Sequence, residues 1–231
     1  MKQSSSPPST SSAAFFDMDG TLVDCNIVEY YVYIRTRMMS PVRAALWKKA
    51  YLIKCLGYLL LDRIDRTRFN LAFYDDYRGL PAEEIKALAA DCYRDVIRPR
   101  CFQQVAACLQ QHRDAGREPV LVTGSLDFLV RPLVEDLRMD HAIAATLVES
   151  DGRFTGELST APIGQEEKAR RVREFAAQHR IDLARSFAYG DSLADLPMLD
   201  LVGHANVVNP DRRLSRLAKS RNWIVHRWTR A

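Results

Sequence analysis

The chain has 231 residues, enough for one domain with a substantial insertion, and a formal net charge of +4. So modest a charge does not indicate a nucleic-acid partner. The five cysteines form an odd number without CxxC spacing, which argues against a disulfide or zinc framework and is typical of reduced thiols in a cytoplasmic protein.

Residues 1–12 are rich in serine and proline and lack the apolar run of a signal peptide, so we expect a disordered tail. The apolar run 13–16 predicts a first strand. Asp17 and Asp19 follow directly, and the period of two residues in extended chain places both on the same side of the backbone. Gly20 allows the sharp turn that must come next. A pair of acids in a turn is weak evidence by itself.

Between residues 25 and 97 apolar residues recur at three- and four-residue spacing, which predicts helices over 27–37, 41–61, 66–77 and 81–96. We expect this segment to form a helical cap inserted after the first strand. The stretch 41–61 is the most apolar, but Lys48, Lys49 and Lys54 argue against a transmembrane helix. A packed helix is the favoured interpretation, and a helix on a membrane surface is the alternative.

After residue 98 helices and strands alternate, which is typical of a doubly wound parallel α/β sheet. Helices are predicted over 101–113, 126–138 and 165–178, and strands over 119–122, 186–189, 205–208 and 223–226. Asp151-Gly152 predicts a two-residue hairpin turn between strands 145–149 and 153–157. The basic residues from Arg212 to Arg230 indicate an exposed terminal helix rather than a nucleic-acid surface. The catalytic core would then comprise 13–24 and 98–231.

Four motifs follow apolar runs in order: Asp17-Met18-Asp19-Gly20-Thr21, Val122-Thr123-Gly124-Ser125, Lys168, and Tyr189 to Asp195. In open α/β sheets the carboxyl ends of the strands bind ligands. Together the motifs resemble the haloacid dehalogenase (HAD) superfamily, and the late motif resembles its subfamily IB, the phosphoserine-phosphatase-like hydrolases. Lys168 alone would be an ordinary surface lysine, and Thr123 alone an ordinary turn residue.

The resemblance implies a Mg²⁺-dependent phosphatase that acts on a small phosphorylated metabolite through an aspartyl-phosphate. Asp17 would be the nucleophile, and Asp19 the acid and base. Mg²⁺ would be held by Asp17, the backbone carbonyl of Asp19, and Asp191. Thr123 would bind the phosphoryl group, and Lys168 would neutralise charge. A cation is needed because two unit charges about 4 Å apart repel by about 4 kcal/mol at an effective dielectric near 20.

Other residues have open roles. Asp195 could ligate the metal through water, orient Lys168 or cap the following helix. Gly124, Ser125 and Asp127 lie close enough in sequence to touch substrate. The remaining histidines show no ligand spacing and are expected to be structural or exposed: His141, His179, His204 and His226.

Two other enzymatic activities fit these motifs: a phosphotransferase or mutase that uses the same intermediate, and a phosphoserine phosphatase proper. A degenerate binding protein would be expected to lack Asp17, Lys168 or Asp191, and all three are present. The sequence does not indicate an oligomeric state.

The resemblance is weakest at the residues that would bind the substrate. Phosphoserine phosphatases carry a glutamate nine residues after the nucleophile, and here that position is Asn26, with Glu29 the next acid. The arginine for the substrate carboxylate would be Arg66, Arg68 or Arg78. We therefore predict that phosphoserine is a poor substrate and that another small monoester is preferred, such as histidinol phosphate or a sugar or polyol phosphate.

Overall fold

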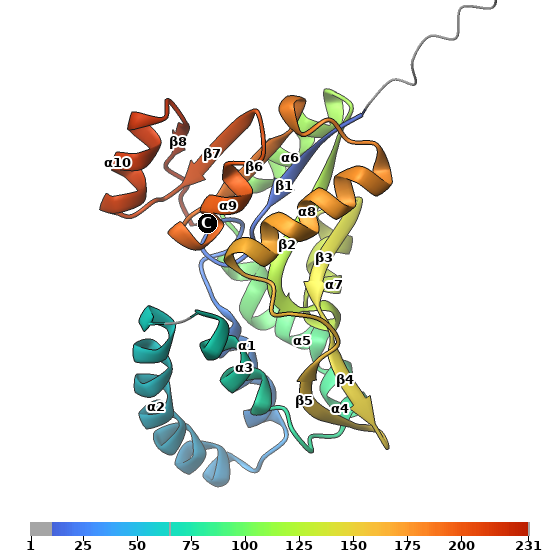
Figure 1. The fold of residues 1–231 in the computed structure, drawn as a ribbon. Helices are drawn as coiled ribbons and strands as arrows, with labels where there is room; N and C mark the ends of the chain where they lie inside the picture. Colours follow the sequence, from blue (N-terminus) through green and yellow to red (C-terminus); the bar gives the residue numbers. More distant parts are fainter. Residues whose placement is uncertain (1–10, 65, 231) are drawn as a thin grey trace, which may run out of the picture.

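The computed structural model describes residues 11–64 and 66–230, and the side chains of these residues outside 62–67. Its centre is a six-stranded, wholly parallel sheet in the order β3-β2-β1-β6-β7-β8 (Figure 1). The strands are β1 (Ser12–Phe16), β2 (Arg117–Leu126), β3 (His141–Ala145), β6 (Phe187–Gly190), β7 (His204–Val208) and β8 (Ile224–His226). The predicted fold class is confirmed. Most of the expected tail, residues 1–10, lies outside the described residues, and β1 already begins at Ser12.

Helices cover both faces of the sheet because alternate residues of β1 are buried on opposite sides. Phe16 belongs to the core cluster that includes residues of α6 (Val105–Asp114) and α7 (Asp127–Asp136). Phe15 belongs to a second cluster, shared with α8 (Gln165–His179), α9 (Leu196–Leu199) and α10 (Arg212–Ser220). Burial on both faces is the reason that β1 is a continuous apolar run rather than an alternating one.

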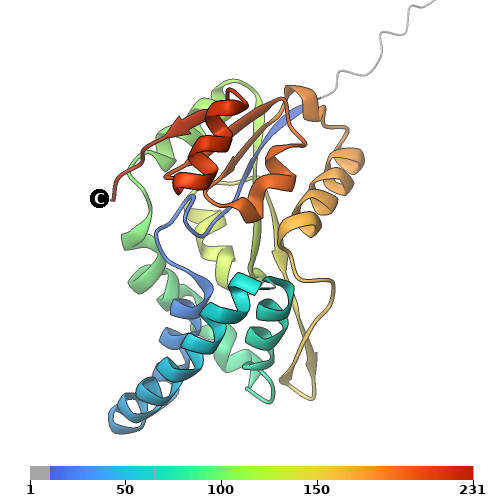
Figure 2. The same ribbon diagram turned by 60° about the vertical axis from the view of Figure 1, so that its left-hand side comes forward.

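The helical insertion lies beyond the carboxyl ends of the strands (Figures 1 and 2). It contains α1 (Ile27–Arg37), α2 (Pro41–Ile64), α3 (Arg66–Asp75), α4 (Ala82–Ala87) and α5 (Ala89–Cys92). The helix predicted over 81–96 is interrupted at Leu88 and ends in a π-helical turn, Tyr93–Ile97, followed by a 3₁₀ turn, Arg98–Arg100. Among the described residues no helix is long and apolar enough to cross a membrane.

The two chain crossings between sheet and insertion run side by side. The backbone N–H of Asp24 donates to the Arg100 carbonyl at 2.9 Å, and that of Phe102 donates to the Leu22 carbonyl at 3.1 Å. These bonds tie the entry and exit of the insertion into one narrow connection.

A hairpin of β4 (Leu147–Ser150) and β5 (Arg153–Leu158) also meets the insertion. Its turn residues Asp151 and Gly152 both have positive φ, 50° and 72°, as expected for the predicted two-residue turn. The Gly79 N–H donates to the Phe154 carbonyl at 2.8 Å, and the Ala82 N–H donates to the Gly152 carbonyl at 2.9 Å. The hairpin is therefore joined by backbone bonds to the helical segment, although it follows β3 in sequence.

Candidate active site

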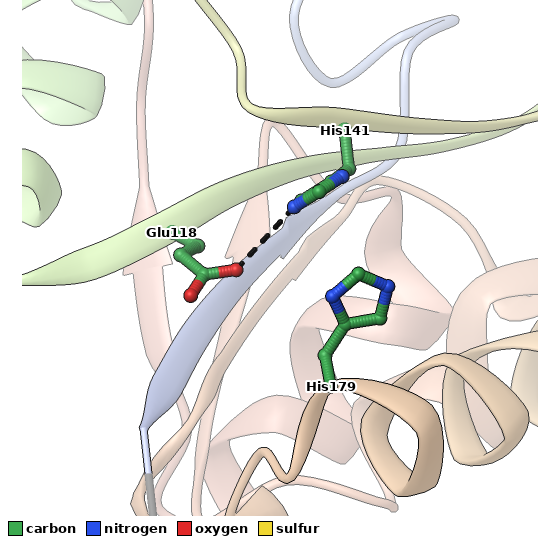
Figure 3. Close-up of side chains that lie close together, drawn as sticks. All are labelled: Glu118, His141 and His179. Atoms are coloured by element: carbon green, nitrogen blue, oxygen red, sulfur yellow. Dashed lines mark ion pairs between the residues drawn. The ribbon is translucent and has the colours of Figure 1, made fainter.

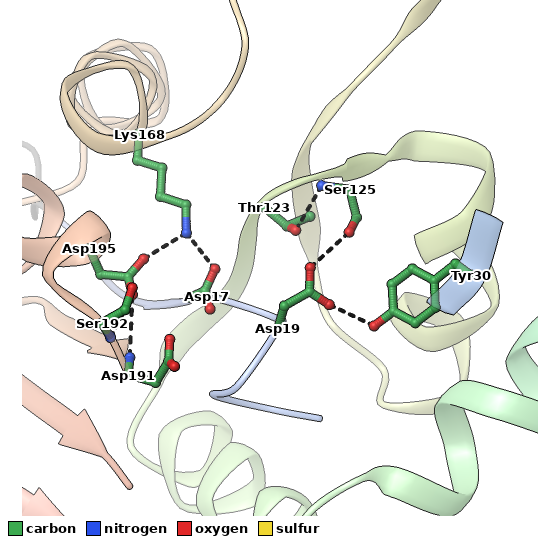
Figure 4. Close-up of polar contacts among 9 residues, drawn as sticks. All are labelled: Asp17, Asp19, Tyr30, Thr123, Ser125, Lys168, Asp191, Ser192 and Asp195. Carbon is green, nitrogen blue, oxygen red and sulfur yellow. Dashed lines mark hydrogen bonds and ion pairs between the residues drawn. The ribbon is translucent and has the colours of Figure 1, made fainter. Parts of the chain in front are cut away.

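The four sequence motifs meet at the carboxyl edge of the sheet (Figure 4). Asp17 directly follows β1, Thr123 lies in β2, and Asp191 directly follows β6. Lys168 lies in the first turn of α8 and is buried. Strands β1, β2 and β6 are neighbours in the sheet, so their ends deliver these side chains to one place.

Lys168 is held between two buried carboxylates. Its ammonium donates to Asp17 Oδ1, and to Asp195 Oδ1 at 2.7 Å. The side chains of the three residues are at most 8% exposed. A buried ammonium in contact with two carboxylates is costly to build and specific in geometry, which makes the cluster the candidate active site.

Asp195 takes one of the roles that the sequence left open, the orientation of Lys168, whereas its side chain does not cap the following helix, α9. While Oδ1 accepts from Lys168, Oδ2 accepts from the Ser192 N–H at 3.2 Å, the Ser192 hydroxyl at 3.1 Å and the Asp191 N–H at 3.3 Å. It thus forms a capping box with Ser192 and positions Lys168 at the same time. Both of its oxygens are engaged, so Asp17 and Asp191 have the more available oxygens of the acidic cluster.

Asp19 lies apart from the lysine, on the side of Thr123 and Ser125 (Figure 4). Its Oδ1 accepts from the Tyr30 hydroxyl at 2.6 Å, and its Oδ2 accepts from the Ser125 hydroxyl at 3.1 Å. The Ser125 N–H in turn donates to Thr123 Oγ1 at 3.0 Å. Sequence reasoning missed Tyr30, which has the spacing of an ordinary core residue of α1. Ser125, expected only to lie near substrate, orients the second acid.

The turn after Asp19 depends on one glycine. Gly20 has φ of +90°, and a Cβ there would run into the Asp191 carboxylate. Glycine at this position therefore allows the loop from β1 to pack directly against the loop from β6.

Burial and mutual repulsion raise the acids' pKa values. Desolvation, followed by the charge of Asp195, raises the pKa of Asp17 to about 7, and the same causes raise that of Asp191 to about 9. Burial alone would lower the pKa of Lys168, but Asp17 and Asp195 raise it above its ordinary value. When all three carboxylates are ionised, they carry more negative charge than the single ammonium offsets.

That excess, carried by oxygen donors, fits a hard divalent cation. Ligand oxygens of Asp17, Asp191 and Asp195 lie within 4.8 Å of one another. A cation held by Asp17 and Asp191 would favour their ionised forms at neutral pH.

Two adjoining cavities meet at Asp19. The smaller, about 50 Å³, is lined by the acidic cluster, Thr123, Gly124 and Asn70 of α3, among other residues. The larger, about 390 Å³, lies under the helical insertion and shares Asp19 and Ile27 with the first. Asn70 is buried and was not predicted; a polar side chain within an apolar helical segment was the only signal that pointed to it. Asp127 is not among the described residues that line either cavity.

The residues considered for substrate recognition take other roles. Asn26 is the N-cap of α1, where its Oδ1 accepts from the Val28 N–H at 3.1 Å. Glu29 forms an ion pair with Arg100. Arg78 pairs with Asp75 at 2.7 Å on the surface. Arg68 is exposed and does not line either cavity, and the side chain of Arg66 lies outside the described residues.

A second group of possible ligands lies at the opposite, amino-terminal edge of the sheet (Figure 3). Glu118 of β2, His141 of β3 and His179 of α8 bring ligand atoms within 4.8 Å of one another. Glu118 faces His141 at 3.5 Å, and the His179 ring stacks on Phe175 with centroids 4.1 Å apart. Tetrahedral zinc needs ligand atoms roughly 3.3–3.5 Å apart. Because an ion pair and a ring stack already explain the arrangement, we assign no metal to it.

Taken together, fold and site define an α/β enzyme with a buried acid–lysine cluster at the carboxyl edge of its sheet. A model of the haloacid dehalogenase-like hydrolase family matches residues 14–200. The chain is 33% identical over 227 residues to a probable phosphatase of Mycobacterium tuberculosis, covering 96% of this chain and 77% of the relative. It is 32% identical over 226 residues to phosphoserine phosphatase SerB1 of the same organism, covering 95% and 71%.

A solved structure from Bordetella pertussis, described as a protein of unknown function, matches with a TM-score of 0.79 and 26% identity, covering 94% of this chain and 99% of that one. The chain belongs to the haloacid dehalogenase-like hydrolase family. The protein is a phosphoric monoester hydrolase.

Proposed function

We propose that this protein hydrolyses a phosphate monoester in two steps, with Asp17 as the nucleophile. The observation that carries the proposal is the buried Asp17, which touches Lys168 and lies beside Asp191 at a small cavity. A second acid, Asp19, lines the same cavity and is held by two donated hydrogen bonds. The first group suits attack on phosphorus, and the second suits proton transfer.

In the first step an Asp17 oxygen forms a bond to phosphorus while the bond from phosphorus to the ester oxygen breaks. Asp19 gives its proton to the departing oxygen, which leaves as an alcohol. In the second step Asp19 takes a proton from water as the water oxygen attacks phosphorus. The bond from Asp17 to phosphorus then breaks, which releases inorganic phosphate and restores both carboxyl groups. Lys168 offsets negative charge at Asp17 throughout, and Thr123 lines the cavity where the phosphoryl group would lie.

HAD phosphatases generally use Mg²⁺. Asp17, Asp191 and the backbone carbonyl of Asp19 are the groups we propose to hold it, and a bound Mg²⁺ would reduce the repulsion between carboxylate and phosphate. The excess of buried carboxylates over lysine supports this donor set.

The test uses an aryl phosphate, whose good leaving group makes the second step slower than the first in an Asp19→Asn variant. After an acid quench, that variant should carry one phosphoryl group on the peptide that contains Asp17. The Asp17→Asn variant should carry none and lose several orders of magnitude in kcat. Asp140→Asn, at an exposed acid, is the matched control. Wild-type turnover by Asp17→Asn, or turnover undiminished by EDTA, would refute the proposal.

We further propose that residues 25–97 act as a cap that opens at the paired crossings near 24–26 and 98–100. The bonds from Gly79 and Ala82 to the β4–β5 hairpin imply that the hairpin moves with the cap. Hydrogen exchange at both crossings should slow when beryllofluoride and Mg²⁺ bind. Exchange at Phe154 and Gly79 should stay unchanged, because those amides move as one unit. Unchanged exchange at the crossings, with the mimic bound, would mean a static cap.

We propose that phosphoserine is a poor substrate. Glu29 is the one acid besides Asp19 among the described residues that line the larger cavity, and its charge is already paired with Arg100. An ammonium that lacks a charged partner there forgoes roughly 1.5–3 kcal/mol, a ten- to hundredfold preference. Phosphate release measured over a panel of phosphorylated metabolites tests this, and a kcat/KM for phosphoserine at least tenfold above the others would overturn it.

We also propose that the protein is cytoplasmic. The absence of disulfides among the five cysteines supports a reducing compartment.

A further inference from the structure

Helix α2 exposes more large aliphatic side chains than any other element that the structure describes. Seven large aliphatic side chains on this one helix are between 59% and 73% exposed: Val42, Leu46, Leu52, Ile53, Leu56, Leu59 and Leu60. They recur at three-, four- and seven-residue spacing and so form a continuous stripe. Such stripes on a soluble protein mark a surface that another apolar phase covers.

The orientation of α2 is fixed by its opposite face. Tyr51 and Tyr58 are buried there and both donate to Asp76 Oδ2, at 2.9 and 2.7 Å. Tyr51 also packs against Tyr31 of α1, and Tyr58 against Phe73 of α3. Because rotating α2 would break these bonds, the aliphatic stripe cannot turn inward, and its exposure is a feature of the fold.

The charge of α2 indicates what covers the stripe. Helix α2 contains five cations, Arg43, Lys48, Lys49, Lys54 and Arg63, and one acid, Asp62. Lys54 pairs with Asp76, and Arg43, Lys48 and Lys49 are exposed beside or within the stripe. An aliphatic stripe with lysines and an arginine around it complements an anionic lipid surface. In a self-association of the same face, this basic set would face itself.

The larger cavity beside Asp19 opens under the same helix. Cys55, Tyr58 and Leu59 of α2 line it together with Ile27, Val28 and Phe69, and its polar lining residues are Asp19, Asn26 and Glu29. Among the described lining residues none is a lysine or an arginine. Leu59 belongs both to the stripe and to the cavity wall, so the chamber adjoining the proposed general acid reaches the outward surface of α2.

We infer that α2 seats the protein on an anionic bilayer surface, and that the larger cavity receives the apolar alcohol portion of a membrane-derived phosphate monoester. This substrate class replaces the polar examples that the sequence suggested, histidinol phosphate and sugar or polyol phosphates. The second half rests on the proposed function, because it needs the ester oxygen beside Asp19. The first half does not depend on catalysis.

Vesicle sedimentation tests the surface. The protein should sediment with phosphatidylcholine–phosphatidylglycerol vesicles, and at least about tenfold less with phosphatidylcholine alone or at high salt. Ile53→Gln/Leu56→Gln/Leu60→Gln should lose this binding while its aryl phosphatase activity in solution is unchanged. Leu71→Gln/Ile224→Gln, at exposed apolar positions outside α2, should bind as the wild type. Binding that is absent in the wild type, or equal in the triple variant, overturns the inference. If the wild type is a dimer in light scattering, the triple variant is a monomer and the wild type does not bind vesicles, the stripe would be assigned to contact with a second copy of the chain instead.

Kinetics test the cavity, with monomeric n-octyl phosphate, glycerol 3-phosphate and an aryl phosphate as substrates. We expect kcat/KM for octyl phosphate to exceed that for glycerol phosphate by at least about tenfold, since burying several methylene groups favours the longer ester. Leu59→Asp should reduce that ratio, mainly through KM. No hydrolysis of any ester would defeat the proposed function itself. Hydrolysis of the aryl phosphate without an octyl preference would defeat only the cavity assignment.

Discussion

Two clusters of ligand-type side chains lie at opposite edges of the same sheet, and α8 contributes to both. At the carboxyl edge Lys168, in its first turn, joins Asp17, Asp191 and Asp195. At the amino edge its last residue, His179, joins Glu118 and His141. Both sets bring ligand atoms within the same 4.8 Å, so proximity does not distinguish them (Figures 3 and 4).

What distinguishes them is burial. At the amino edge the Glu118 and His141 side chains are 37% and 36% exposed, so water solvates both. At the carboxyl edge Asp17 and Lys168 are 8% and 7% exposed, so each charge depends on its neighbours. Burial is therefore the feature that separates the proposed catalytic cluster from the amino-edge cluster, and the following predictions test that distinction.

Among the substitutions that compare the two edges, the largest effect is expected from Lys168→Met, which removes the cation of the carboxyl-edge cluster. Loss of a preorganised charge at the reacting group should lower kcat on an aryl phosphate by about 10²–10³. His179→Ala at the other end of α8 is the matched control and should leave kcat unchanged. Circular dichroism checks that both variants fold. Equal kcat values for the two variants would show that the carboxyl-edge cluster is no more important for catalysis than the amino-edge cluster.

Asp195→Asn should lower kcat by about 10- to 100-fold, because Lys168 loses one of its two anchoring charges. A purely structural role would not shift the pH profile, but this substitution should. The charge of Asp195 raises the pKa of Asp17, so its removal should lower that pKa and move the acid limb of the kcat profile to lower pH. Glu118→Gln, the equivalent loss of a carboxylate at the amino edge, should change neither kcat nor the acid limb of the pH profile. An unmoved acid limb in Asp195→Asn would contradict the coupling.

Metal and protons should compete at the carboxyl edge. Folding raises the pKa of Asp17 from 3.8 to about 7 and that of Asp191 to about 9, so the metal-free folded protein binds more protons than the unfolded chain between these values. The contribution of these two groups to the free energy of unfolding therefore falls as pH rises through that range. Mg²⁺ replaces the protons, and its stabilising effect should be larger near pH 8 than near pH 5.5.

Differential scanning calorimetry with and without Mg²⁺ measures this effect. Asp17→Asn should flatten the pH dependence, whereas Glu118→Gln should not. An increase in Tm by Mg²⁺ that is independent of pH would show that these carboxyl groups do not titrate on binding.

The smallest effect is expected from Glu118→Gln combined with His141→Ala. An exposed pair of this kind contributes about 0–1 kcal/mol to the free energy of unfolding, and kcat should not change. Urea unfolding and aryl phosphate kinetics measure the two quantities. A large loss of activity would show that the amino edge is coupled to the site through α8.

The comparison also shows why the sequence could predict one edge and not the other. Asp17, Asp19 and Asp191 were identifiable because each follows an apolar run, and parallel strands must end at a common edge. The histidines at 141 and 179 have no such ordering, since one begins a strand that was not predicted and the other ends a helix. Their approach depends on how α8 lies across β2 and β3.

Within the site, the tertiary structure supplied the contacts between distant elements. The hydroxyl of Tyr30 reaches Asp19 from the helical insertion, and Asn70 lines the small cavity from α3. Ion pairing of Glu29 with Arg100 joins residues 71 positions apart. No local pattern encodes such pairs, because they arise only when the insertion folds back over the strand ends.

The sequence by itself determined the parallel α/β core, the inserted helices, the Asp-Gly hairpin turn and the order of the four motifs. These features depend on periodicity and on residues within a few positions of one another, where backbone geometry leaves few choices. Only the tertiary structure decided that Asp195 both caps a turn and holds Lys168, that the hairpin bonds to the insertion, and which face of α2 is exposed. Each of these depends on burial, and burial is a property of how elements pack rather than of any single segment.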